Sequence, residues 1–263
     1  ERKDDDKRYR PVYVALLTRK GLAAQFRDEA LAALGKMDAA SRSRVLLEAL
    51  ARVPADDPLT AEKLLGLLLS QPAETLRKER DTFTQAIDAA SPPPLVLRGA
   101  YAALMLCDGK PDLAWQAAVK HDGHIVELML GVRYIPDANL RAQLFAPVST
   151  LLGSTDAAAT RTAALDALGW ARPDEAAFEL LAREVKPDAA PATRAAALAS
   201  LQRIPDNAWP PAAIEPLARG IVATVQAIAP EGRTEPDVLD ALQFGERLAA
   251  RLPDEPKRII RRD

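Results

Sequence analysis

The sequence predicts an all-α protein, specifically an α-solenoid of about seven antiparallel helix pairs. Its 263 residues are 48% apolar and only 5% aromatic, and the apolar positions are mostly Ala and Leu. Both are strong helix formers, whereas the β-branched and aromatic residues that favour strands are scarce. Apolar residues also recur at helical spacing almost from end to end, so composition and order both indicate helices.

Clusters of Pro, Gly or Asp interrupt the helical pattern about every 12 to 18 residues. Proline is tolerated at the start of a helix, where its missing N–H would be unpaired in any case. Asp56-Asp57-Pro58 and Ser91-Pro92 place a capping residue beside such a proline. These signals predict about fourteen helices, and loops of roughly two to six residues make each helix fold back beside its predecessor.

A sequence pattern repeats in the second helices of the expected pairs. Arg, Ala, Leu and Leu occur at positions i, i+3, i+4 and i+7 in Arg27–Leu34, Arg161–Leu168 and Arg194–Leu201. Arg98–Leu104 is a weaker copy and Val238–Leu242 a decayed one. The four arginines are separated by 71, 63 and 33 residues, which is roughly two, two and one units of about 33. A fixed period of that size indicates a stacked repeat protein.

The repeated residues give a reason for stacking. They lie on one helix face, where the Ala allows close approach and each buried Leu contributes about 1.5–3 kcal/mol. One pair cannot bury that face alone. We expect the arginines to form a repeat ladder, with members Arg27, Arg98, Arg161 and Arg194. Asp188 precedes Arg194 by six residues, which resembles the Asp and Arg ladder that links neighbouring HEAT repeats.

Charge, hydropathy and cysteine content exclude several classes of protein. The 35 basic residues nearly balance the 37 acidic ones, so the formal charge of −2 gives no long-range attraction for a polyanion. The longest apolar run, Ala100 to Cys107, is well short of the roughly 18 residues that span a bilayer, so no membrane span is expected. Cys107 is the only cysteine, which excludes an internal disulfide and a cysteine-based zinc or haem site.

One cluster, His121, His124 and Glu127, has the residue types of a metal site. Gly123 indicates a turn between the histidines, and zinc requires three or four well-placed ligands, so we interpret them as solvated loop residues. Cys107 ends an apolar helix without a nearby His or Cys in sequence and is interpreted as a buried structural thiol. We therefore expect no metal, no cofactor and no catalytic residue in this chain, which by itself is not expected to be an enzyme.

The charged runs are interpreted as caps, solvated segments and a tail. Asp4–Asp6 and Asp56-Asp57 lack the Gly and the terminal Glu of a calcium loop. The densest basic run is Lys257–Arg262, near the end of the sequence. Some HEAT-like proteins bind DNA and excise alkylated bases with a basic concave face that carries aromatic side chains. A nucleic-acid-binding protein or a DNA glycosylase-like enzyme is thus the alternative function, although no nucleic-acid partner is expected.

Trp209 is the residue with the most unusual neighbourhood, since Pro210 and Pro211 follow it directly. A Trp beside two prolines is a possible exposed docking spot for a partner. In the other interpretation, Trp209 packs backwards and fixes the start of the next helix. Of the two interpretations, the sequence favours the second.

Four stretches resemble one family: Arg8–Gly21, Ala100–Gly109, Arg203–Pro211 and Gly232–Gln243. They are similar to the HEAT-like segment of large exported bacterial proteins that also carry a c-type cytochrome domain and often cupredoxin or sugar-dehydrogenase-like domains. The resemblance covers about residues 8–253 and implies a periplasmic or exported location, with the redox chemistry on neighbouring domains. No redox residue is carried over, because the chain lacks the Cys-x-x-Cys-His haem motif and the cupredoxin ligands.

Both ends of the sequence are rich in charge and poor in apolar residues. We therefore expect linkers at 1–9 and 253–263 around a HEAT-like solenoid at 10–252, in a chain cut from a longer polypeptide. The expected function is that of a non-catalytic scaffold or spacer. Its partners would be other domains of the same polypeptide or another protein.

Overall fold

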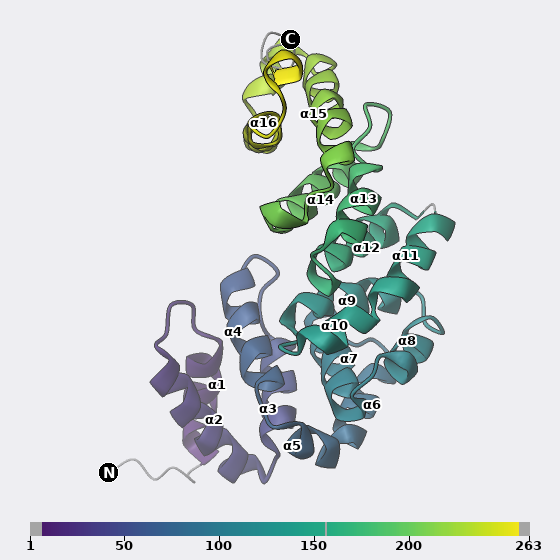
Figure 1. Cartoon of the computed structure of the whole chain (residues 1–263). Helices are drawn as coiled ribbons and strands as arrows, with labels where there is room; N and C mark the ends of the chain where they lie inside the picture. Colours follow the sequence, from purple (N-terminus) through teal and green to yellow (C-terminus); the bar gives the residue numbers. More distant parts are fainter. Residues whose placement is uncertain (1–6, 156, 258–263) are drawn as a thin grey trace. The chain divides into compact units, whose positions relative to one another are not determined.

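The computed structural model describes residues 7–155 and 157–257. Within these ranges the regular secondary structure consists of sixteen α-helices, four short 3-10 turns and a helical segment at 254–257, with no strand (Figure 1). The all-α prediction is confirmed. No helix in the described ranges is long and apolar enough to cross a bilayer. The acidic run Asp4–Asp6 and most of the basic run at 257–262 lie outside the described residues.

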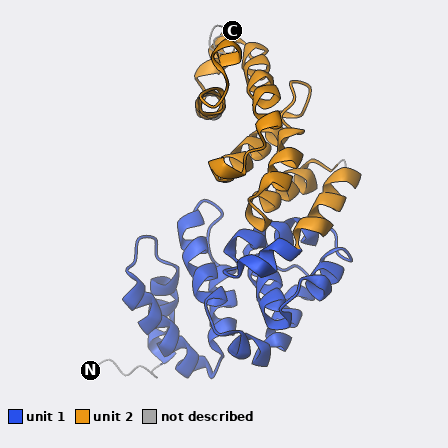
Figure 2. Cartoon of the chain, in the orientation of Figure 1, with its two compact units in different colours: residues 1–143 blue, residues 144–263 orange. Residues whose placement is uncertain are grey.

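Two compact units make up the chain, residues 1–143 and residues 144–263 (Figure 2). The prediction from the sequence was one HEAT-like solenoid over 10–252. At the ends, Lys7–Tyr9 form the 3-10 turn η1 and residues 254–257 are helical. The described parts of both expected linkers therefore carry helical structure.

Helix α7 is the centre of unit 1. Ten of its fifteen residues are buried, and it packs against α3, α4, α5, α6, α8 and α9. A helix that is mostly apolar and buried along most of its length, as this one is, belongs in a core. The helices of the unit are α1 (Arg10–Thr18), α2 (Ala24–Asp38), α3 (Arg42–Leu50), α4 (Pro58–Leu69), α5 (Ala73–Lys78), α6 (Arg80–Ile87), α7 (Pro94–Asp108), α8 (Asp112–Ala118), α9 (His124–Gly131) and α10 (Ala138–Gln143), with η2 (Val132–Tyr134) after α9.

Two glycines allow other helices to approach α7 closely. A Cβ atom at Gly99 of α7 would lie 2.9 Å from Leu68 Cδ2 of α4. A Cβ atom at Gly131 of α9 would lie 3.0 Å from the carbonyl oxygen of Arg98. The helix ends at Gly109, whose φ of +65° is the left-handed conformation that glycine adopts freely at a helix C-terminus.

Unit 2 contains three helix pairs. Helix α11 packs against α12, α13 against α14 and α15 against α16, and α12 also packs against α14. A close approach occurs at Gly169 of α12, where a Cβ atom would lie 2.9 Å from Cβ of the fully buried Ser200 of α14. The helices are α11 (Phe145–Ser154), α12 (Ala158–Ala171), α13 (Glu175–Ala182), α14 (Pro191–Leu201), α15 (Pro211–Gln226) and α16 (Pro236–Ala249), with the turns η3 (Asp206–Ala208) and η4 (Pro230–Thr234).

The sixteen observed helices exceed the predicted number of about fourteen because two helix boundaries have no sequence signal. Helices α5 and α6 are separated only by Glu79, and α10 and α11 only by Leu144. Neither residue is a Pro or a Gly, and neither boundary carries the turn residues that usually mark one. Helix-breaking residues therefore do not predict these two interruptions.

Candidate functional site

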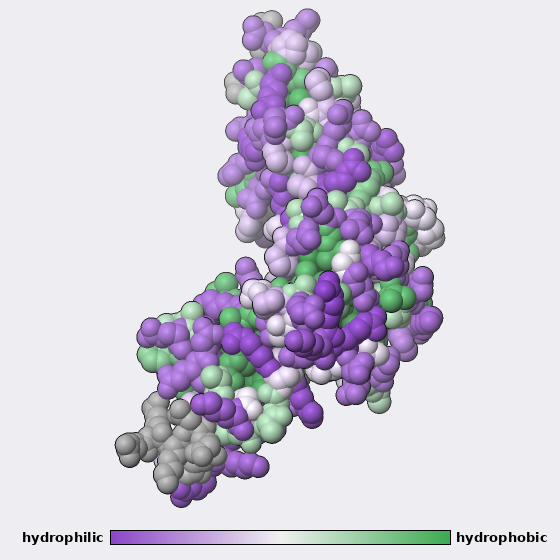
Figure 3. All heavy atoms as spheres, turned by 60° about the horizontal axis from the view of Figure 1, so that its bottom comes forward, coloured by the Kyte–Doolittle hydropathy of each residue, from purple (hydrophilic) through white to green (hydrophobic). Residues whose placement is uncertain are grey.

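The molecular surface is mainly hydrophilic on the face drawn in Figure 3, where the apolar areas are small and separated from one another. The large apolar side chains that are exposed come from different helices and turns; they are Tyr9, Val12, Phe26, Leu59, Leu113, Val119 and Leu239. A hollow lined by apolar side chains is a better candidate for a ligand site than such scattered residues.

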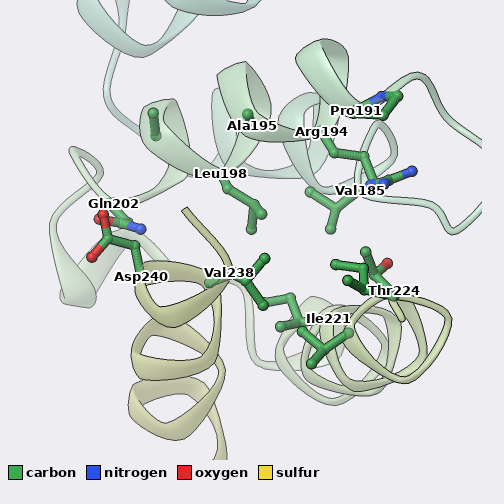
Figure 4. Close-up of a pocket in the computed structure, with 14 residues that line it drawn as sticks. Val185, Pro191, Arg194, Ala195, Leu198, Gln202, Ile221, Thr224, Val238 and Asp240 are labelled. Carbon is green, nitrogen blue, oxygen red and sulfur yellow. The ribbon is translucent and has the colours of Figure 1, made fainter. Parts of the chain in front are cut away.

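Such a hollow lies in unit 2 among α14, α15 and α16 (Figure 4). Its volume is about 420 Å³, and its apolar lining includes Leu198, Ile221, Val225 and Val238. Three of these side chains, Leu198, Ile221 and Val238, converge on the middle of the pocket in Figure 4. A pocket of this size with mostly apolar walls is typical of a small-molecule site.

Polar groups stand at two opposite sides of this pocket. Arg194 lies at one side, with Thr224 nearby, and Gln202 and Asp240 lie together at the other side (Figure 4). The Thr224 hydroxyl donates to the Gly220 carbonyl 2.8 Å away, so its hydrogen is already used. Within the described residues neither Arg194 nor Asp240 forms an ion pair, and each leaves a charge beside the apolar middle.

The pocket exists because the packing between α12 and α14 is not repeated one step along the chain. Position 169 of α12 is a glycine that lies against Ser200, whereas the residue 33 positions later is Gln202, which directly follows the last residue of α14. Helix α16 packs against α15 and η4, and the exposed Ala195 and Ala199 of α14 line the pocket instead of meeting another helix. The missing close contact leaves the hollow.

Three of the predicted ladder arginines occupy one structural position, the fourth residue of a helix, and donate to backbone carbonyls. Arg27 is only 2% exposed and donates to the carbonyl oxygens of Leu17, Arg19 and Leu22, at 3.3, 2.6 and 2.5 Å. These acceptors belong to the end of α1 and to the following loop. Carbonyls at a helix C-terminus lack intrahelical donors and carry partial negative charge, so a guanidinium is well suited to them.

Arg161 and Arg194 repeat this arrangement in unit 2. Arg161 donates to the carbonyl oxygens of Leu152 and Thr155, at 3.1 and 3.4 Å, and it also pairs with Glu184 at 2.5 Å. Arg194 donates through Nη1 to the carbonyl oxygens of Pro187, at 3.0 Å, and Ala189. Each arginine thus ties the second helix of a pair to the segment that precedes it.

Asp188 does not pair with Arg194, contrary to the expectation from the sequence. Asp188 is exposed, and Arg194 bonds to the two carbonyls that flank it rather than to its carboxylate. Arg98 differs again, since its Nε donates to Glu127 at 2.5 Å. The side chain of a helical residue points back over the preceding turn, so backbone carbonyls of the loop are the nearest acceptors for three of the four arginines.

The histidine cluster is partly buried rather than fully solvated. His124 is the first residue of α9, and its Nδ1 lies 2.8 Å from the hydroxyl of the buried Tyr101. The exposed His121 stacks on His124 with 4.8 Å between ring centroids. Burial, and to a lesser degree the charge of His121, lowers the pKa of His124. The third member of the predicted cluster, Glu127, is paired with Arg98, and no described residues form a group of three or more potential metal ligands.

Cys107 lies buried near the end of α7, at 4% exposure. Burial raises the pKa of its thiol to about 11, so the nucleophilic thiolate is scarce at neutral pH. The acidic residue Asp57 caps α4 by accepting from the backbone N–H of Thr60 at 3.1 Å. These two placements follow the interpretations drawn from the sequence.

Trp209 is only 4% exposed and lies within the core of unit 2. Its indole Nε1 donates to the Ile204 carbonyl at 3.0 Å, and its ring centroid is 5.9 Å from that of Phe178 and 5.5 Å from that of Phe244. Pro210 is also buried, and the exposed Pro211 begins α15. The ring therefore packs backwards at the start of α15, and it is not exposed for docking.

Of the pocket residues, Arg194 was singled out in the sequence, but as a member of the ladder; the pocket itself was not predicted, since its residues come from three helices and their loops. The one available signal was the change from Gly169 to Gln202 at matching positions of the repeat. Comparison with models of protein families, with curated proteins and with solved structures finds no match for this chain. Any conclusion about function therefore depends on the residues themselves.

Proposed function

We propose that this chain is a non-catalytic binding scaffold, built as an α-solenoid of HEAT-like helix pairs. The recurring arginine carries this proposal, because Arg27, Arg161 and Arg194 tie the second helix of a pair to the preceding segment by the same kind of carbonyl contact. The recurrence of this contact in three helix pairs supports a stack of similar pairs. Stacked pairs provide extended surfaces for partners, which is the usual role of such arrays.

The proposal extends to a larger, exported and redox-active polypeptide. Its support is the resemblance of four sequence stretches to HEAT-like segments that are joined to cytochrome and cupredoxin or dehydrogenase-like domains. In that setting the neighbouring domains would perform the electron transfer, and this chain would hold them or a partner protein in position. Cofactors would then be absent from this chain and present in the whole polypeptide.

The chemistry of the described side chains favours a scaffold over an enzyme. Burial raises the pKa of Tyr101 to about 12 and that of Cys107 to about 11, so neither group is readily ionised at neutral pH. A glycosylase-like enzyme would need aromatic rings open to a base. Trp209 has Arg247 and Arg251 over its ring, but it is buried, and both arginines pair with Asp206.

The deciding experiment is the visible absorption spectrum and mass of the native, untruncated polypeptide purified from its source. We expect a haem or blue-copper band in a polypeptide much longer than 263 residues. The recombinant 263-residue chain serves as the colourless control. A colourless native chain of about this length would overturn the redox-scaffold proposal.

A further inference from the structure

We propose that the pocket among α14, α15 and α16 binds a long-chain monocarboxylate, with the alkyl chain between the three helices and the carboxylate at Arg194. This inference goes beyond the scaffold proposal and does not depend on it. It concerns a small-molecule site within unit 2, whatever larger polypeptide contains the unit.

The walls of the pocket favour an alkyl chain. Leu198, Ile221, Val225 and Val238 form apolar surface around a volume of about 420 Å³, and Val185 adds to it beside Arg194 (Figure 4). Ile221 is 1% exposed and Val225 8%, so these walls are parts of the core and not loose surface side chains. Filling the hollow would remove the remaining apolar surface from water at about 25 cal/mol per Å².

Arg194 supplies the partner for a carboxylate. Its Nη1 is held by the carbonyls of Pro187 and Ala189, which fix the guanidinium at one side of the pocket. No described acidic side chain pairs with it, whereas its repeat equivalent Arg161 pairs with Glu184. A guanidinium carries five N–H donors, so Nε and Nη2 retain donors for the planar carboxylate group.

The opposite side of the pocket selects against a second negative charge. Asp240 and Gln202 lie together there, and within the described residues Asp240 has no cationic partner (Figure 4). A second carboxylate at the far end of the ligand would meet that negative charge. A methyl or hydroxyl end would not, so the ligand is a monocarboxylate rather than a dicarboxylate.

A helix from a partner protein is the competing occupant. The face of α14 that lines the pocket corresponds to the face that α12 presents to α14, and it could in principle receive another helix. A helix is about 10 Å across, however, and α16 already bounds the space with Val238, Asp240 and Ala241. A pocket that is bounded by α16 and lined by a single basic residue, Arg194, fits an alkyl carboxylate better.

Calorimetric titration of the 263-residue chain with dodecanoate, dodecylammonium and dodecanedioate tests the charge assignment. All three probes are used below their micellar concentrations. We expect saturable binding of one dodecanoate, and binding at least about tenfold weaker for the other two. Dodecanedioate places a second carboxylate beside Asp240. Dodecylammonium is repelled by Arg194 in one orientation, and in the other it gains only a solvent-exposed pair with Asp240. Absence of dodecanoate binding, or equal binding of all three probes, would overturn the proposal.

Arg194→Gln and Arg161→Gln form a matched pair of variants. Both lose an arginine at the fourth residue of a helix and its carbonyl contacts, but only Arg194 lines the pocket. We expect Arg194→Gln to weaken dodecanoate binding about tenfold and Arg161→Gln to leave it unchanged. Equal affinities of the two variants, with helical circular dichroism retained, would show that Arg194 does not hold the carboxylate.

Ala195→Trp and Ala192→Trp test the location without touching a charged group. Both alanines are exposed residues of α14, but only Ala195 lines the pocket. An indole at position 195 should fill the hollow and abolish dodecanoate binding, while the variant at position 192 should bind as the unchanged chain does. Retained binding in Ala195→Trp would place the ligand elsewhere and contradict the proposal.

Discussion

Helix α7 of unit 1 and helix α14 of unit 2 carry versions of the same repeated pattern but have different surroundings. Helix α7 is packed by six other helices, and glycines at two of its contacts bring α4 and α9 close. Helix α14 is closely packed against α12, but its next face borders the pocket. The repeated pattern therefore accounts for both helices, but it does not determine how closely other helices pack against them.

The difference lies in the residues outside the pattern. Within α14 the pattern positions Ala197 and Leu201 are fully buried, as are Ala164 and Leu168 at the same positions of α12. Whether the next helix can then approach depends on a residue that the pattern does not specify. Gly169 permits contact at backbone distance, whereas the side chain of Gln202, 33 positions later, lines the pocket.

Replacing equivalent leucines of α12 and α14 gives the largest expected contrast. Leu165→Ala creates a void in a fully buried site and should reduce the free energy of unfolding of unit 2 by about 2–5 kcal/mol. Leu198→Ala should cost less, about 1–2 kcal/mol, because that side chain is 9% exposed and already borders a hollow. Denaturant unfolding monitored by hydrogen exchange in unit 2 measures both. Equal losses would show that the two interfaces are equally well packed.

A smaller effect is expected from the residue that permits the close approach. In Gly169→Ala the new Cβ would lie 2.9 Å from Ser200 Cβ and 3.2 Å from the Ser200 backbone, which cannot easily move. Overpacking of this kind costs about 1–3 kcal/mol, which outweighs the gain of about 1 kcal/mol in helix propensity. Thermal or denaturant unfolding of unit 2 should therefore show a net loss.

Gly153→Ala is the matched control, because a Cβ atom at Gly153 of α11 would meet nothing within 4 Å. It should stabilise unit 2 by about 0.5–1 kcal/mol through helix propensity alone. Stabilisation by Gly169→Ala as well would mean that α12 and α14 are not in tight contact at that point.

The sequence predicted the helices and their buried faces well, because Ala, Leu and Pro act locally. It also identified Arg27, Arg161 and Arg194 as related residues, but not their acceptors, since backbone carbonyls have no sequence signal of their own. The pocket could not be predicted for a similar reason. It depends on where α16 lies relative to α14, which follows from packing between segments distant in sequence rather than from either helix alone.

The smallest expected effect is a pH dependence confined to unit 1, since His121 and His124 are the only histidines of the chain. Burial lowers the pKa of His124 below its usual value of 6.5, so the folded state binds its proton less readily than the unfolded state does. The contribution of neutral His124 to the free energy of unfolding is fully present above pH 6.5. It is lost as the pH falls through the lower pKa of the folded state.

Hydrogen exchange at pH 7 and at pH 5.5, corrected for intrinsic rates, should therefore show weaker protection of α7 and α9 at the lower pH. The helices of unit 2 serve as the internal control and should keep their protection, because unit 2 contains no histidine. In His124→Gln the amide can still reach the Tyr101 hydroxyl but has no proton to gain, so the difference between the two pH values should disappear. If the difference in protection between pH 7 and pH 5.5 persists in that variant, groups other than His124 cause the pH dependence.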